Sequence, residues 1–246
     1  MKFHAPAFFL IAASVLSISC GSEAPQNSPP PTVDPPVHIQ PVEGQGTIVG
    51  QVLFKGIPPV LKRTTVNKDQ KACGEFKDSE ELVAGPDKGI KWAVVSLDFR
   101  PVDMKWKGTR LDQQGCRFSP HVRLIPAGSK LTILNPDGVL HNFHSYSVIN
   151  PPVNRAQPKF RKEMDVQFDK PEIFKIGCDA HSWMAGWIVV MEHPFYAVTD
   201  EKGSFKFEGV PAGKRVLKIW HETLGELNVE VEVRAGEMTR VSFEMK

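Results

Sequence analysis

The sequence is divided into short segments in which apolar and polar residues alternate, separated by turns rich in glycine and proline. Clear examples are residues 47–54 and 93–97, and, near the end of the chain, residues 229–233 and 239–243. A period of two residues places alternate side chains on opposite faces of a strand, so that one face can be buried. No stretch of the sequence has a sustained helical period. We therefore predict an all-β fold.

A cluster of soft metal-binding side chains lies between two of the predicted strands. Cys178, His181 and Met184 follow one another at intervals of three residues, just before the apolar run at 187–191. On a strand such positions point to opposite faces, so the three side chains can converge only in a tight loop. Thiolate, imidazole and thioether are the donors of a blue-copper site, which also takes a second histidine. The loop is therefore predicted to hold one copper ion.

The same spacing also fits one face of a helical turn in which cysteine and methionine are ordinary core residues. The segment is too short for an independent helix, and it lies between Gly177 and Gly186 and runs into a β-branched strand. These features favour the loop.

The second histidine is expected upstream, where an Asn-Pro-Asp-Gly turn at residues 135–138 ends one strand. His141 begins the next element, and His144 follows three residues later. On extended backbone only one of the two can face the metal, and this spacing alone leaves the choice open.

The motif Cys178-x2-His181-x2-Met184, with His141-Asn142 upstream, resembles the cupredoxins, the small blue-copper electron carriers of the plastocyanin and amicyanin type. The resemblance covers residues 109–192, and it includes the strands expected before the first histidine. One departure is Ser182, which stands where many relatives carry proline.

This resemblance implies a Greek-key β-sandwich with one type 1 copper ion. The implied ligands are His141, Cys178, His181 and Met184. Asn142 would tune the metal by hydrogen bonding near the sulfur, and His144 would be a surface histidine or a partner of another side chain. Trp183 and Trp187 would pack around the site, and an aromatic ring at its edge could also lie on an electron path.

The implied function is one-electron transfer to a redox protein such as a cytochrome or an oxidase, and not catalysis. A dinuclear centre would need two bridging thiolates, and nitrite reductase or oxidase chemistry would need clustered histidines, whereas the 8 histidines here are scattered. A copper-holding or delivery protein, and a surface binding module with a structural metal, are the alternatives. A net charge of +2 without a polybasic block argues against nucleic acid as a partner.

The C-terminal part resembles the transthyretin-like β-sandwich that is appended to some carboxypeptidases. Its marks are Thr199-Asp200-x-x-Gly203-x-Phe205 and Val210-Pro211-x-Gly213. Such a module normally opens with strands like residues 47–54 and 93–97, which here precede the copper segment.

That order predicts a discontinuous sandwich, formed by residues 46–108 plus 193–246, with the cupredoxin domain at 109–192 inserted into it. Insertion is tolerated when the ends of the inserted domain lie close together at the surface. The alternative is a tandem in which residues 46–192 form one enlarged cupredoxin domain.

Cys73 and Cys116 remain once the proposed ligand Cys178 and the leader residue Cys20 are set aside. In an exported protein a disulfide between them is expected, and it would stabilise the fold by roughly 3 kcal/mol. The alternative is a second metal site formed by Cys116 and His121. The polar segment at 64–90 around Cys73 is predicted to be a long loop.

The first residues are predicted to form an export signal, since Lys2 precedes an apolar centre that is too short to remain as a spanning helix. The predicted signal, residues 1–19, is followed by Cys20, which resembles the lipidated cysteine of bacterial lipoproteins. Residues 20–45 are predicted to form a proline-rich tether. The chain is thus expected to be exported and lipid-anchored to a bacterial membrane, facing the periplasm or the exterior. A soluble secreted protein cleaved near the same point is the alternative.

Overall fold

A computed structural model describes residues 1–2, 44–104, 106 and 108–246 of the chain. The predicted signal segment, Cys20 and almost all of the predicted tether lie outside the described residues. Within the described residues, no helix is long and apolar enough to cross a membrane.

The structure of the described residues confirms the prediction of an all-β fold. Its one described helix is α1 (Gln70–Cys73), and the remaining regular structure consists of strands. The strands build two larger pairs of sheets and two short hairpins. We call the larger pairs the ligand sandwich and the terminal sandwich.

The ligand sandwich contains a four-stranded and a five-stranded sheet. The four-stranded sheet has the order β13 (Glu163–Gln167), β10 (Lys130–Leu134), β7 (Thr109–Gln113), β8 (Phe118–Ser119). The five-stranded sheet has the order β12 (Asn154–Gln157), β11 (His141–Ser145), β14 (Glu172–Gly177), β15 (Ala185–Met191), β9 (Val122–Pro126). Strands such as β10 alternate exposed and buried residues, as a strand with one core-facing side should.

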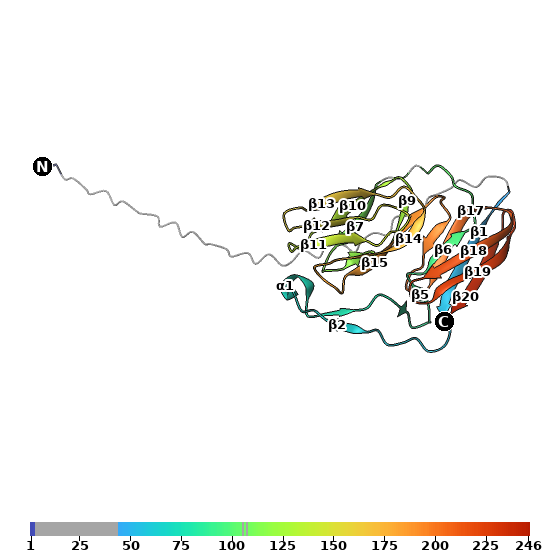
Figure 1. Cartoon of the computed structure of the whole chain (residues 1–246), viewed down its shortest axis with the longest axis horizontal. Helices are drawn as coiled ribbons and strands as arrows, with labels where there is room; N and C mark the ends of the chain where they lie inside the picture. The colour runs from blue at the N-terminus through green and yellow to red at the C-terminus, as the bar shows by residue number, and fades with distance from the viewer. Residues whose placement is uncertain (3–43, 105, 107) are drawn as a thin grey trace. The chain divides into compact units, whose positions relative to one another are not determined.

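The terminal sandwich combines strands from both ends of the described chain. Its three-stranded sheet has the order β17 (Ser204–Pro211), β1 (Gln45–Phe54), β20 (Met238–Met245). Its four-stranded sheet has the order β16 (Tyr196–Val198), β6 (Val94–Leu97), β18 (Gly213–His221), β19 (Gly225–Val233). Figure 1 shows the blue strand β1 lying among the red C-terminal strands.

Strand β1 is central to this sandwich, because it pairs antiparallel with β17 and parallel with β20. Residues from both parts of the sequence also share one hydrophobic core, in which Ile48 and Val95 are buried together with Phe243. The strands on either side of the ligand sandwich therefore depend on one another for burial. Domain boundaries at residues 108 and 193 remain a prediction.

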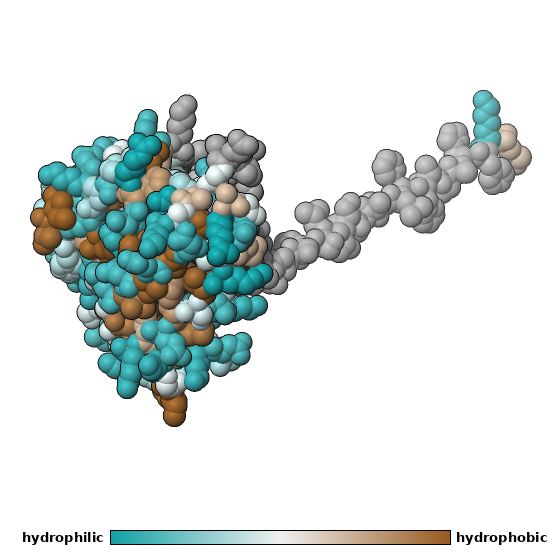
Figure 2. All heavy atoms as spheres, turned by 90° about the vertical axis from the view of Figure 1, so that its right-hand side faces the viewer, coloured by the Kyte–Doolittle hydropathy of each residue, from teal (hydrophilic) through white to brown (hydrophobic). Residues whose placement is uncertain are grey.

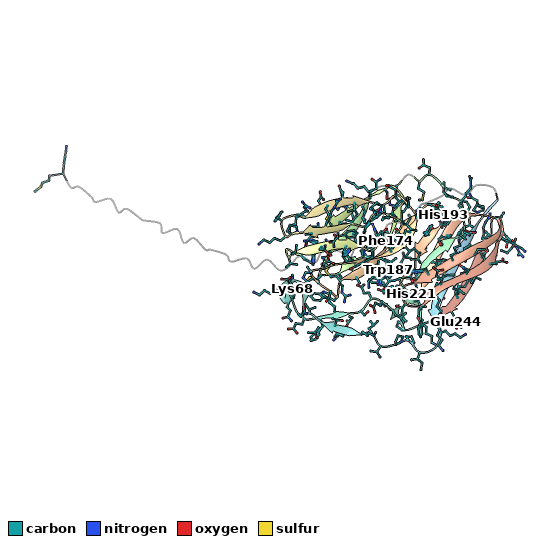
Figure 3. The ribbon with its side chains drawn as sticks, in the orientation of Figure 1. Lys68, Phe174, Trp187, His193, His221 and Glu244 are labelled. Atoms are coloured by element: carbon teal, nitrogen blue, oxygen red, sulfur yellow. A yellow bond between two sulfur atoms is a disulfide. The ribbon has the colours of Figure 1, made fainter. Side chains whose placement is uncertain are left out.

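The two sandwiches meet at a mixed apolar and polar contact. Val94 of β6 is buried against Val122 and Val189 of the ligand sandwich. Trp187 of β15 packs edge-to-face against Trp220 of β18 with 4.8 Å between ring centroids, and its Nε1 donates to Glu222 at 2.8 Å. Figure 3 labels Trp187 and His221 in this region.

The segment at 64–90 differs from the long loop that its sequence suggested. It contributes to two hairpins and to α1; the strands are β2 (Arg63–Thr65), β3 (Phe76–Asp78), β4 (Val83–Ala84) and β5 (Ile90–Lys91). Elements of two to four residues are too short to produce a visible period, which is why the loop prediction was wrong.

The second residue of β15, Gly186, lies where no side chain fits. A Cβ at this position would lie 2.8 Å from the carbonyl oxygen of His121, which accepts a hydrogen bond from the Trp187 N–H at 2.7 Å. Any larger residue would therefore push β15 away from the start of β9.

The terminal sandwich also has a surface that suits contact with solvent. Figure 2 looks onto its side, where hydrophilic residues cover most of the surface and hydrophobic ones interrupt them in places. Along β19 exposed and partly buried residues alternate until the buried Val233. Scattered exposed apolar residues of this kind are normal for a folded domain.

Glu172 ties the loop after β11 to the start of β14. Its carboxylate accepts hydrogen bonds from the backbone N–H groups of Val148 at 2.7 Å and of Ile149 and Asn150 at 3.1 Å. Burial would raise the pKa of Glu172, but hydrogen bonds from Ser147, Asn150 and these backbone groups outweigh it and lower the pKa to about 2. The charged carboxylate is therefore part of the folded structure.

Because its pKa is lower when folded, Glu172 stabilises the protein above pH 4.5 and loses this effect as the pH falls toward 2. Glu172→Gln should thus lower the free energy of unfolding at pH 7 by roughly 1–3 kcal/mol. The difference from wild type should shrink on acidification. Thermal or urea unfolding at neutral and acidic pH measures it, with the exposed Glu163→Gln as a control. An equal difference at both pH values would contradict this role of the charge.

Candidate metal centre

The loop between β14 and β15 folds into consecutive tight turns. The His181 N–H donates to the carbonyl of Cys178 at 3.2 Å, and the Met184 N–H donates to the carbonyl of His181 at 2.9 Å. A third bond, from the Cys178 N–H to the carbonyl of Met184 at 3.3 Å, closes the loop. This curvature lets residues three apart approach one another, which extended backbone would prevent.

Three of the predicted ligands come together at one point. One donor atom each of His141, Cys178 and His181 lies within 4.8 Å of the other two. His141 Nδ1 lies 3.1 Å from His181 Nδ1, which lies 3.7 Å from Cys178 Sγ. Metal bonds of about 2.0–2.3 Å place neighbouring donors roughly 3–4 Å apart, so this set fits one ion.

All three side chains are shielded from solvent. The exposed fraction is 0% for His141 and His181 and 5% for Cys178, and Cys178 is a free cysteine. A buried sulfur and two imidazole nitrogens are the donors that copper prefers. Both the chemistry and the spacing of the donor set therefore fit a copper ion.

Asp137 orients His141 from the turn that precedes β11. Its Oδ2 lies 2.8 Å from His141 Nε2 and also accepts the backbone N–H of Cys116 at 2.7 Å. Burial lowers the pKa of His141, but hydrogen bonds to Asp137 and Cys178 raise it to about 9 overall. Since a carboxylate only accepts, Nε2 carries a proton toward Asp137, and Nδ1 is the nitrogen that faces the other donors.

Asp69, which is distant in the sequence, orients His181 as Asp137 orients His141. Its Oδ2 lies 3.0 Å from His181 Nε2. Burial lowers the pKa of His181, and the partly exposed Asp69 opposes that effect only in part. Asp69 occupies the N-cap position of α1 with a φ of 52°, a left-handed conformation that aspartate tolerates better than most residues. Figure 3 labels the adjacent Lys68.

The sulfur of Cys178 is held in a polar environment. The backbone N–H of Asn142 donates to Sγ at 3.3 Å. Burial raises the pKa of the Cys178 thiol, but hydrogen bonds from His141 and from backbone groups including Asn142 lower it overall. These contacts therefore stabilise the thiolate relative to an unperturbed cysteine, and the thiolate is the form that binds metal.

Asn142 also connects β11 to the ligand loop. Its side-chain oxygen accepts the backbone N–H of Asp179 at 2.7 Å, and its amide donates to Asn154. Asn142 thus contacts both the sulfur, through its backbone N–H, and the loop that carries the sulfur, through its side chain.

The fourth predicted ligand, Met184, ends the loop and is 2% exposed within the core of the ligand sandwich. Its backbone is fixed by the bonds to His181 and Cys178 described above. Trp183, beside it, packs against the His181 ring with 5.1 Å between centroids.

His144 faces away from the three donors. Its Nδ1 lies 2.9 Å from Asp179 Oδ1, and its ring stacks on Tyr146 with 4.3 Å between centroids. It is partly exposed, whereas His141 is fully buried. Because residues three apart on β11 point to opposite sides, the fold places only His141 at the centre.

Cys73 and Cys116 form a disulfide, which joins the end of α1 to the turn before β8. The alternative partner His121 lies elsewhere, because its Nε2 contacts the Glu222 carboxylate across the junction of the sandwiches.

The two carboxylates that contact the ligand histidines, Asp137 and Asp69, were not singled out from the sequence. Asp137 could have been, since it lies four residues before His141, whereas Asp69 is 112 residues from His181.

His141→Ala should remove or reshape the copper site, because it deletes one of three converging donors, while His144→Ala should largely preserve it. Bound copper and the visible spectrum of the two variants measure the difference. Equal losses would show that the two faces of β11 do not have separate roles.

Asp69→Ala should weaken copper binding by about 10–100-fold, because the carboxylate fixes the ring orientation of His181. Competition with a chelator of known affinity measures the change. The control is Asp179→Ala, which removes the corresponding carboxylate from His144 instead. A similar loss in the control, or no loss in Asp69→Ala, would remove Asp69 from the site.

No protein-family model matches this sequence, and no curated protein shows significant similarity to it. Solved structures do match one part of it. Amicyanin from Paracoccus versutus is 16% identical, covering 39% of this chain and 97% of its own, with a TM-score of 0.31. A purple cupredoxin from Nitrosopumilus maritimus is 22% identical, covering 34% of this chain and 99% of its own, with a TM-score of 0.29.

A copper-containing nitrite reductase from Thermus scotoductus SA-01 is 24% identical with a TM-score of 0.31. The match covers 38% of this chain but only 26% of the reductase. Each of the three likenesses leaves most of the present chain unmatched.

Proposed function

We propose that this protein is a type 1 copper protein that carries single electrons. The observation that carries this is the buried convergence of His141, Cys178 and His181, with one donor atom of each within 4.8 Å of the others. Met184 would be the weak axial ligand that tunes the potential. Bound copper would supply the redox chemistry, by alternating between its monovalent and divalent forms.

The surrounding residues suit electron transfer because they hold the ligands in fixed positions. Asp137 and Asp69 orient the two imidazoles, and the Asn142 N–H donates to the sulfur. Ligands locked by a second set of contacts rearrange little when the charge of the metal changes. Burial also excludes water from the donors.

A copper-holding or delivery protein would use the same ligands without a redox partner. Its metal must leave readily, whereas here both histidines are fully buried and hydrogen-bonded on their outer nitrogens. That arrangement favours the carrier. Catalysis at this centre is not part of the proposal.

The experiment is reconstitution with one equivalent of divalent copper, followed by a reductive titration. An electron carrier should show intense thiolate-to-copper absorption that disappears on uptake of about one electron per copper and returns on reoxidation. A colourless protein that holds only monovalent copper or zinc would support the holding role instead.

We further propose that the chain is exported and held at a bacterial membrane by lipid on Cys20, where it meets a redox protein such as a cytochrome or an oxidase. The support is the sequence of residues 1–45 alone. Mass spectrometry of the mature N-terminus tests the anchor. Acyl chains on Cys20 are expected, and cleavage without acylation would contradict it.

A further inference from the structure

The Cys73–Cys116 disulfide lies directly against the proposed copper centre. Both sulfur atoms lie within 4.8 Å of a ring nitrogen of His181. Cys116 Sγ also lies within 4.8 Å of ligand atoms of Asp137 and His141. The disulfide and the three-donor set therefore share one buried cluster of soft donors.

We infer that this disulfide is a second metal site in latent form, which binds monovalent copper when the bond is reduced. A dithiol reductant would supply two electrons and two protons. The S–S bond breaks, two S–H bonds form, and the reductant closes its own disulfide. Binding of the ion then releases the thiol protons to solvent.

The chain keeps the two sulfurs close after the bond breaks, because each cysteine is anchored by a residue of the first site. The Cys116 N–H donates to Asp137 Oδ2 at 2.7 Å, and the Cys73 N–H donates to the Asp69 carbonyl at 2.9 Å. Asp137 and Asp69 are the same residues that hold His141 and His181. Reduction therefore leaves two thiols facing the His181 ring.

A pair of thiolates beside an imidazole selects a soft ion, and copper(I) is the expected occupant. Both cysteines are almost fully buried, at 2% and 0% exposure, so the ion would be shielded from water. Both ring nitrogens of His181 are already engaged, Nδ1 toward Cys178 and Nε2 toward Asp69, so the second ion would be held by the two sulfurs, which are independent of Cys178. The second site can therefore be tested separately.

The test is the number of copper(I) ions bound per chain, measured under anaerobic conditions against a coloured copper(I) chelator. Wild type and Cys178→Ser are each compared before and after treatment with dithiothreitol, which is then removed, and free thiols are counted. Wild type should rise from about one ion to about two, and Cys178→Ser from about zero to about one. Cys73→Ser/Cys116→Ser should not respond to the reductant.

No gain in either protein after the thiols have appeared would overturn the inference, as would a disulfide that resists reduction while the chain is folded. A gain that persists in the double serine variant would also overturn it. If the double serine variant fails to fold, the comparison of Cys178→Ser before and after reduction still tests the inference. Failure of the electron-carrier proposal looks different: oxidised wild type would bind no copper, while reduced Cys178→Ser would still bind one ion.

Discussion

Cys178→Ser should abolish the intense visible absorption of the copper-loaded protein while the chain remains folded. The absorption requires a sulfur donor, and Cys178 is the free cysteine among the described residues. Cys178 is one member of a large hydrophobic core, and serine is similar in size, so the substitution leaves the rest of that core in place. Visible absorption and circular dichroism of both proteins measure the two effects.

The matched control is Ser182→Ala, which changes a neighbouring loop residue that provides none of the predicted ligands. It should keep the absorption. If Cys178→Ser keeps its colour, the sulfur that binds copper is a different one, and the assignment of the centre to this loop is wrong.

Residues 193–246 expressed alone should be unfolded. They lack β1, the middle strand of the three-stranded sheet, and β6, an internal strand of the four-stranded sheet. Each sheet would lose an internal partner, and the shared core would lose Ile48 and Val95. Sheets interrupted in this way cannot bury enough apolar surface to be stable. Dispersion of amide NMR signals measures the outcome.

The companion experiment is residues 109–192 carrying Cys116→Ser, because the partner Cys73 is absent from this fragment. It contains all strands of the ligand sandwich and all four predicted ligands, so it should fold and bind copper. Its affinity should be lower than that of the full chain, since Asp69 is missing. A well-folded tail together with an unfolded 109–192 fragment would favour the tandem arrangement.

The fold class could be predicted from the sequence because the longer strands alternate visibly. Strand β10 has the pattern exposed, buried, partly buried, buried, partly buried, which its residues already suggest. The short elements between residues 63 and 91 could not be predicted, since two or three residues do not define a period.

The candidate site was only partly predictable. His141, Cys178 and His181 could be proposed because their chemical types and local spacing are informative, and the fold brings the three together. Asp69 could not, because its contact with His181 depends on how a distant segment packs. The position of the disulfide beside His181 depends on the same packing.

The most direct test of the central claim is X-ray absorption at the copper edge of the protein loaded with one divalent copper ion. If His141, Cys178 and His181 hold the ion together, the spectrum should contain two nitrogen ligands and one short sulfur ligand, at about 2.0–2.3 Å. A copper shell made only of nitrogen and oxygen would contradict the claim.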